Sequence, residues 1–110
     1  MAVSSPKEFM ETVLPAKLSD PEKLKGLDLA LQFRITGEQG GEWVLIIKDQ
    51  KAEVREGTIE NPKITLQMKD EDYVKLVNDE ISGQKAFMSG KLRFKGDMNT
   101  GMKLQKLGII

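Results

Sequence analysis

Residues 27–36 read LDLALQFRIT, and leucine, phenylalanine and isoleucine occupy every second position of this stretch. Successive side chains of a β-strand point to opposite faces, so the alternation predicts a strand with one covered face. The glycine-rich residues 37–41, GEQGG, are typical of a hairpin loop. Residues 43–47, WVLII, are apolar without interruption, as expected for a central strand. Together, residues 27–47 predict a β-hairpin.

The same alternation marks three further strands. Asp49 and Gln50 turn the chain into a third strand over residues 51–56. A fourth strand is expected at residues 64–68 and a fifth at residues 92–95. Because the first three strands follow one another through short turns, we expect a largely antiparallel sheet.

The N-terminal segment has the signals of a short amphipathic helix. Ser5 is a suitable N-cap, and Glu8 follows three residues later, as in a capping box. Pro15 is expected to end this helix, because proline disrupts a helix interior. Residues 15–26 are polar and contain proline, so a loop or a helical turn is expected around residues 21–24.

Three helices are expected in the second half of the chain. Asp70 is a suitable cap for a helix with apolar residues between 73 and 77. A short helix is expected at residues 83–88, and Asp97 is a suitable cap for a last helix that includes Leu107. The predicted fold class is therefore α+β, with a five-stranded, mostly antiparallel sheet and helices packed on one face.

Composition limits the function. The 110 residues fit one domain, 1–110, with a formal net charge of zero, so no nucleic-acid partner is expected. The chain has no cysteine and no histidine, which excludes thiolate nucleophiles, Ser-His-Asp triads and Cys/His zinc sites. We expect no catalytic residues, no cofactor and no metal. No signal peptide is evident, and the longest apolar run is too short to span a membrane, so a cytoplasmic location is expected.

Any catalysis would have to rest on carboxylates, lysine, tyrosine or hydroxyl groups, and the acidic residues are the main candidates. Asp70, Glu71 and Asp72 are adjacent, but consecutive helical residues diverge by about 100°. They therefore form neither a general acid/base pair nor a compact Mg²⁺ cage. A solvated helix start is the expected role of these acids.

The last helix has two apolar sectors. Met98 and Met102 project to one side, whereas Leu104 and Leu107 project away from them. A helix that only covers a sheet needs one apolar stripe, so the second sector indicates another apolar contact. That contact is a bound ligand, a dimer partner or further burial. The methionine side chain adapts to variable apolar shapes, which favours a ligand.

Charge is distributed unevenly along the chain. Residues 84–110 contain six lysines and arginines but a single acidic residue, Asp97, so this segment carries +5 and the remainder −5. A solvated face explains such a run. The alternative is a segment that meets an anionic headgroup, a coenzyme A phosphate or an acidic lipid surface.

Residues 84–98, QKAFMSGKLRFKGDM, resemble the signature of the sterol carrier protein (type 2) lipid-transfer domain family, and so do residues 102–107, MKLQKL. Four upstream pieces follow the order of this family: residues 43–49, Gly57 with Asn61-Pro62, residues 64–66 and residues 70–73. The resemblance covers about residues 5 to 107. One departure is Asp49-Gln50-Lys51, where a glycine is common.

The resemblance implies a hydrophobic tunnel between sheet and helices that accepts fatty acids, fatty acyl-CoA, sterols or isoprenoid lipids, and no catalytic residues. The candidate wall residues are Phe33, Trp43, Leu45, Ile81, Phe87, Met88, Phe94, Met98, Met102 and Leu107, with Phe9 and Met10 as a lid. The expected partners are a small apolar lipid, transiently a membrane surface, and a second copy or a lipid-metabolising enzyme. Open alternatives are a domain that presents lipid to an enzyme and a dimerising module without ligand.

Overall fold

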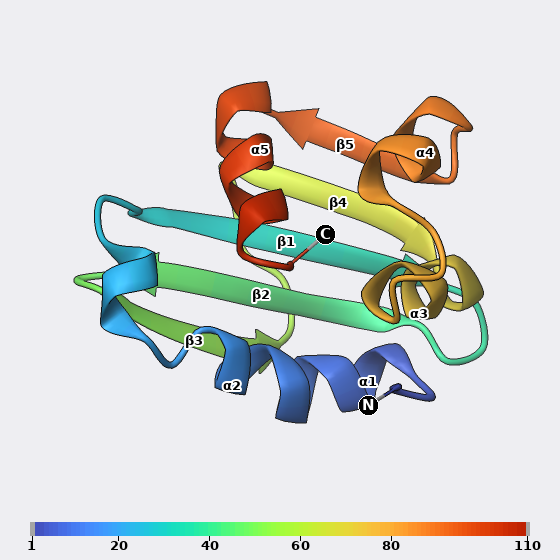
Figure 1. Ribbon diagram of the computed structural model, residues 1–110, viewed down its shortest axis with the longest axis horizontal. Helices are drawn as coiled ribbons and strands as arrows, with labels where there is room; N and C mark the ends of the chain where they lie inside the picture. Colours follow the sequence, from blue (N-terminus) through green and yellow to red (C-terminus); the bar gives the residue numbers. More distant parts are fainter. Residues whose placement is uncertain (1, 110) are drawn as a thin grey trace.

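The computed structural model describes residues 2–109 and is built around a five-stranded sheet (Figure 1). The strands are β1 (Leu29–Thr36), β2 (Gly41–Lys48), β3 (Lys51–Glu56), β4 (Ile64–Lys69) and β5 (Leu92–Gly96), in the spatial order β3-β2-β1-β4-β5. β1 pairs with β4 in parallel, and the other three pairings are antiparallel. The mostly antiparallel sheet expected from the sequence is confirmed.

The helices gather on one face of the sheet and along its β3 edge (Figure 1). The N-terminal helix consists of α1 (Pro6–Glu8), a π-helical turn η1 (Phe9–Val13) and α2 (Leu14–Lys17), and the 3₁₀ turn η2 (Pro21–Leu24) follows. The remaining helices are α3 (Asp70–Val77), α4 (Gly83–Met88) and α5 (Met98–Lys106). The predicted α+β class is therefore confirmed.

The core lies between the sheet and these helices. The strand register places Phe33 of β1 beside Trp43 of β2 and Leu66 of β4, and Leu66 beside Phe94 of β5. Tyr73 of α3 packs edge-on against the ring of Phe33, with ring centroids 6.1 Å apart. An apolar row thus crosses the sheet, and α3 covers its centre.

A loop, residues 57–63, crosses the opposite face of the sheet. The buried side chain of Gln32 fastens it, because its amide nitrogen donates to Gly57 O at 3.1 Å and its amide oxygen accepts from Ile59 N at 3.1 Å. The same nitrogen also lies 3.1 Å from Trp43 O. On the face that carries Gln32, Val44 of β2 is completely buried and Ile46 partly buried, which is consistent with the apolar character of residues 43–47 on both faces.

Two expected boundaries are wrong. The N-terminal helix passes Pro15 and continues to Lys17. In the π-helical turn before it, Leu14 N–H bonds to Phe9 O, and Pro15 then stands in the first turn of α2, where proline is tolerated. β1 starts at Leu29 rather than at Leu27, since Leu27 N–H bonds to Leu24 O.

Asp70 does not have the expected role of helix cap. It is the first residue of α3, and its carboxylate accepts a hydrogen bond from Gln39 N–H at 2.9 Å. This contact fastens the β1–β2 hairpin loop to the helix and lowers the pKa of Asp70 below its usual value. Gly37 makes room for the carboxylate, because a Cβ there would lie 2.5 Å from Asp70 Cγ.

The β2–β3 hairpin shows how the chain accommodates Asp49-Gln50, where the family it resembles commonly has a glycine. Both residues have positive φ, 53° and 60°, and Lys48 pairs with Lys51 across the turn. A two-residue turn of this kind needs positive φ at both positions, which glycine adopts most readily. The chain makes the same turn without glycine.

Candidate functional site

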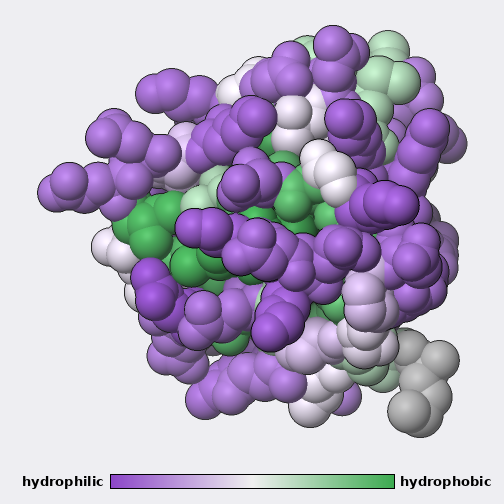
Figure 2. All heavy atoms as spheres, turned by 90° about the vertical axis from the view of Figure 1, so that its left-hand side faces the viewer, coloured by the Kyte–Doolittle hydropathy of each residue, from purple (hydrophilic) through white to green (hydrophobic). Residues whose placement is uncertain are grey.

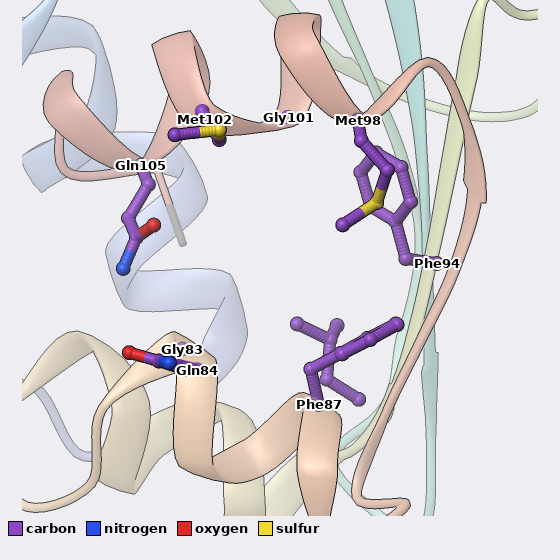
Figure 3. Close-up of a pocket in the computed structure, with 9 residues that line it drawn as sticks. Gly83, Gln84, Phe87, Phe94, Met98, Gly101, Met102 and Gln105 are labelled. Atoms are coloured by element: carbon purple, nitrogen blue, oxygen red, sulfur yellow. The ribbon is translucent and has the colours of Figure 1, made fainter.

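An apolar pocket of about 330 Å³ lies between α4, β5 and α5 and is open to solvent on one side (Figure 3). Its nine lining residues come from a short segment of the chain: Gly83, Gln84, Phe87, Leu92, Phe94, Met98, Gly101, Met102 and Gln105. Leu92 and Phe94 form its floor on β5, and the side chains of the two helices point toward one another across it (Figure 3). The apolar space expected between sheet and helices is seen here as a pocket with an opening to solvent.

Two residues position α5 beside this pocket: the N-cap Asp97 and the glycine Gly101. Asp97 accepts hydrogen bonds from Thr100 N–H at 3.2 Å and from Thr100 Oγ1 at 2.8 Å, and these contacts lower its pKa. Gly101 brings the helix close to the sheet, because a Cβ on it would lie 2.7 Å from Phe94 Cζ. The helix axis therefore lies close to the Phe94 ring.

The two apolar sectors of α5 are confirmed. Leu104 is fully buried in the core, whereas Met98 and Met102 are 56% and 60% exposed and line the pocket. Gln105 follows Met98 by seven residues, two helical turns, and completes the same stripe. One side of the helix thus stabilises the fold, and the other forms a pocket wall.

The helix α4 forms the opposite wall. Ser82 caps it by accepting from Lys85 N–H at 3.1 Å, and Ala86 is buried against the core. Gln84 and Phe87 are then left on the pocket side (Figure 3).

Seen from the left-hand side of Figure 1, the surface is mostly hydrophilic, with a hydrophobic band across its middle and a paler hydrophobic patch near the top (Figure 2).

The pocket is uncharged. The polar side chains among its nine lining residues are two carboxamides, Gln84 and Gln105, one on each helix (Figure 3). A smaller depression of about 250 Å³ adjoins it and shares Gly83 and Gln105 with it. Ile81 lies in this second depression, which Lys17, Asp79 and Ser82 make more polar than the pocket.

The structure brings four predicted wall residues together at the pocket: Phe87, Phe94, Met98 and Met102. Ile81 lines the adjoining depression, Leu107 is half-buried, and Met88 is 77% exposed at the end of α4. The role of all these residues in ligand binding stays a prediction.

The other candidates lie in the core. Phe33, Trp43 and Leu45 are buried on the helix-covered face of the sheet, apart from the pocket lining. The indole N–H of Trp43 has no hydrogen-bond partner among residues 2–109. Phe9 and Met10, predicted as a lid, are at most 1% exposed, and the Phe9 ring packs on Tyr73 at 5.8 Å.

Sequence reasoning missed part of the lining. Gln105 could have been found, because it continues the Met98–Met102 stripe by a further helical turn. Leu92 could also have been found, because it stands two residues before Phe94 on the predicted fifth strand and so shares its face. Gln84 lies inside the segment that resembles the family signature, but nothing in its own pattern marks it. No sequence pattern marks Gly101 as a lining residue, because its role depends on how closely α5 approaches β5.

The described residues offer no competing metal site. Within residues 2–109 no group of three or more aspartates and glutamates is placed to hold a metal ion. Asp70 is engaged with the hairpin loop, while Glu71 and Asp72 follow it in the first turn of α3. None of the helices in this part of the chain is long and apolar enough to cross a bilayer.

A comparison with known proteins finds curated relatives of this chain. The curated relative hydroxysteroid dehydrogenase-like protein 2 from Rattus norvegicus is 34% identical over 96 residues, which cover 86% of this chain and 18% of that protein. The chain thus spans about a fifth of the length of the curated relatives it matches.

Solved structures share the fold. Sterol carrier protein domain 2 of Helicoverpa armigera superposes with a TM-score of 0.79 at 27% identity, covering 98% of this chain and 92% of that one. Sterol carrier protein 2 of Aedes aegypti, solved in complex with palmitate, has a TM-score of 0.62 at 19% identity, covering 86% and 90%. A family model for the SCP-2 sterol transfer family matches residues 10–108. The chain therefore belongs to the SCP-2 sterol transfer family.

Proposed function

We propose that the chain is a non-catalytic lipid carrier that holds an acyl chain or a comparable apolar lipid in the α4–α5 pocket. The observation that carries the proposal is a pocket with apolar walls, two carboxamides and no charged lining residue. Such a site binds by burial and fixes orientation through few polar groups. The palmitate bound to the Aedes aegypti relative is a ligand of this type.

The expected affinity follows from burial. Each methylene removed from water contributes about 0.8 kcal/mol, so a 16-carbon chain gains at most about 12 kcal/mol. Association costs an estimated 4–15 kcal/mol in lost freedom and ordering. A pocket of about 330 Å³ that is open to solvent leaves part of the chain in water, so we expect a dissociation constant of about 1 μM at best.

The two carboxamides suit headgroups near the pocket opening. Gln84 and Gln105 can each donate through NH₂ and accept through the carbonyl oxygen, so they can orient a hydroxyl, an ester or a carboxylate. Neither side chain hydrogen-bonds to another residue within 2–109, and both are exposed. We propose that the headgroup lies between them while the apolar tail lies against Phe87 and Phe94.

A second function rests on the relatives. This chain matches about a fifth of hydroxysteroid dehydrogenase-like protein 2, so in that protein the domain stands beside a much longer polypeptide. The alternative is therefore that the domain presents its lipid to an enzyme. Addition of lipid-loaded chain to a dehydrogenase partner would speed turnover of that lipid if this alternative holds.

The cytoplasmic location stays a prediction.

Met102→Trp tests the pocket. The larger side chain fills the space between α5 and α4, so binding of a fluorescent fatty acid should fall at least tenfold. The thermal midpoint should change little, because Met102 is 60% exposed. Asn99→Trp is the matched control, since Asn99 is exposed on the same helix, outside the pocket lining. Unchanged binding by Met102→Trp, or equal loss in both variants, would contradict this site.

A further inference from the structure

The outermost strand β5 leaves one edge of the sheet open. It pairs with β4 on its inner side, and in the order β3-β2-β1-β4-β5 no strand follows it (Figure 1). At the opposite end of the sheet, the N-terminal helix runs along β3 (Figure 1). Within residues 2–109, no backbone hydrogen bond joins Leu92–Gly96 to a residue outside β4. Every second residue of β5 therefore turns its N–H and C=O groups away from the sheet without a backbone partner.

The two faces of β5 carry different side chains. Leu92 and Phe94 lie on the helix-covered face and form the pocket floor. Arg93 and Lys95 lie on the other face, because side chains alternate along a strand, and both are exposed. A strand added beside β5 would therefore meet apolar side chains on one face and two positive charges on the other.

No carboxylate within residues 2–109 pairs with these two cations. Neither Arg93 nor Lys95 takes part in the three ion pairs formed by the described chain. Their cross-strand neighbours on β4 are the uncharged Gln67 and Thr65. Asp72 lines the same surface depression as Arg93 but forms no ion pair with it. The open edge thus offers two positive charges for a strand of opposite charge.

We propose that β5 binds an extended acidic segment of a protein partner as a sixth strand of the sheet. The segment carries glutamate or aspartate at alternate positions, opposite Arg93 and Lys95, and apolar residues between them, beside Leu92 and Phe94. Main-chain hydrogen bonds to the open edge supply affinity, and opposite charges on neighbouring strands supply specificity. The inference goes beyond the lipid-carrier function and does not depend on it, since it uses the edge of β5 and not the pocket.

Charge argues against a second copy of the chain as the added strand. When two β5 strands pair antiparallel around a two-fold axis, like faces coincide, so Arg93 and Lys95 meet the same residues of the other copy. Like charges directly opposite each other destabilise a strand pair. Basic side chains on an edge strand discourage such self-pairing and leave the edge to an acidic strand.

The test is calorimetric titration of the full chain with a capped synthetic peptide of about six residues in which glutamate and valine alternate. This peptide should bind, whereas a lysine–valine peptide of the same length should not. A third peptide has the same composition, but its glutamates and valines form two blocks. It should bind about fivefold more weakly or worse, because only alternation places all the acids on one face.

Hydrogen exchange measured by NMR locates the bound peptide. Amides at every second residue of Leu92–Gly96 should exchange more slowly when the glutamate–valine peptide is bound, because they then donate to its carbonyl groups. The amides of β5 that already face β4 should change little. Protection at another surface without protection in β5 would contradict the proposal.

Variants of β5 test the charge pairing. Arg93→Gln with Lys95→Gln should weaken binding by up to about 25-fold, since each opposed charge pair contributes up to about fivefold. The matched control is Arg55→Gln with Lys48→Gln, which removes the same charges from exposed positions on the same face of the sheet, far from β5. The control should bind with unchanged affinity. Arg93→Glu with Lys95→Glu should bind the lysine–valine peptide instead, a reversal that an unfolded variant would not show.

Three further results would overturn the proposal. The first is no binding of the alternating glutamate–valine peptide, or equal binding of the alternating and blocked peptides. The second is an equal loss of binding in the control variant. The third is a stable dimer in sedimentation velocity whose β5 amides are protected without any peptide, which would assign the open edge to a second copy of the chain.

Discussion

Gly101→Ala would test how the fold builds the pocket. In a helix interior alanine is more stable than glycine by about 1 kcal/mol, so propensity alone predicts a more stable protein. The structure predicts the opposite, because the new Cβ would lie 2.7 Å from Phe94 Cζ and 2.9 Å from Phe94 Cε2. Either α5 moves outward or the Phe94 ring turns into the pocket.

The magnitude follows from these two effects. Overpacking costs about 1–3 kcal/mol, and subtracting the helix gain of about 1 kcal/mol leaves a net destabilisation of roughly 1 kcal/mol. For a domain of this size that lowers the thermal midpoint by about 4 °C. A ring displaced into the pocket excludes lipid, and each methylene kept in water costs about 0.8 kcal/mol, roughly fourfold in affinity.

The assay combines calorimetric unfolding with titration of a fluorescent fatty acid. Asn99→Ala is the control on the same helix, because Asn99 is exposed and the change adds helix propensity without a new contact. The control should be slightly more stable and bind with unchanged affinity. If Gly101→Ala behaves like Asn99→Ala, with a raised midpoint and full affinity, the close approach of α5 to Phe94 does not shape the pocket.

Two further predictions concern buried polar groups. Gln32→Leu removes the side chain that bonds to Gly57 O and Ile59 N, so urea unfolding should show a loss of about 2–4 kcal/mol, whereas Gln67→Leu on the same face should change less than about 0.5 kcal/mol. Equal effects would mean that the loop needs no such anchor. Tyr73 is buried and donates to Ile109 O at 3.3 Å, and burial raises its pKa above the ordinary value of 10.0. The unfolded chain therefore loses this proton above about pH 10 while the folded chain keeps it, and stability should fall by up to about 1.4 kcal/mol per pH unit. Tyrosinate absorbance from this single tyrosine near pH 10, with the fold intact, would refute the assignment.

Local patterns predicted the elements of this fold well. The period-two alternation located four strands and the uninterrupted apolar run of residues 43–47 located β2, and the caps Ser5 and Asp97 both accept the expected backbone hydrogen bonds. These features depend on residues close in sequence, so one sequence is enough to predict them. The two-sided character of α5 was predictable for the same reason, because a helix fixes the angle between its side chains.

Predictions failed where a distant residue changed a local preference. Aspartate is a common N-cap residue, but the carboxylate of Asp70 accepts a hydrogen bond from Gln39 N–H of the hairpin loop. Pro15 normally ends a helix, but the wider turn before it lets the helix continue to Lys17. In both cases the outcome depends on backbone geometry that the residue itself does not determine.

The sequence by itself determined the sheet, the helices and the family to which the chain belongs. The tertiary structure alone decided which apolar residues line a pocket. Phe33 and Phe94 have the same strand pattern and lie in the same row across the sheet, on either side of Leu66. Tyr73 covers Phe33, whereas Phe94 lies under α5 at the pocket floor. A side chain lines a cavity because its neighbours leave space beside it, and that space is a property of the packed molecule.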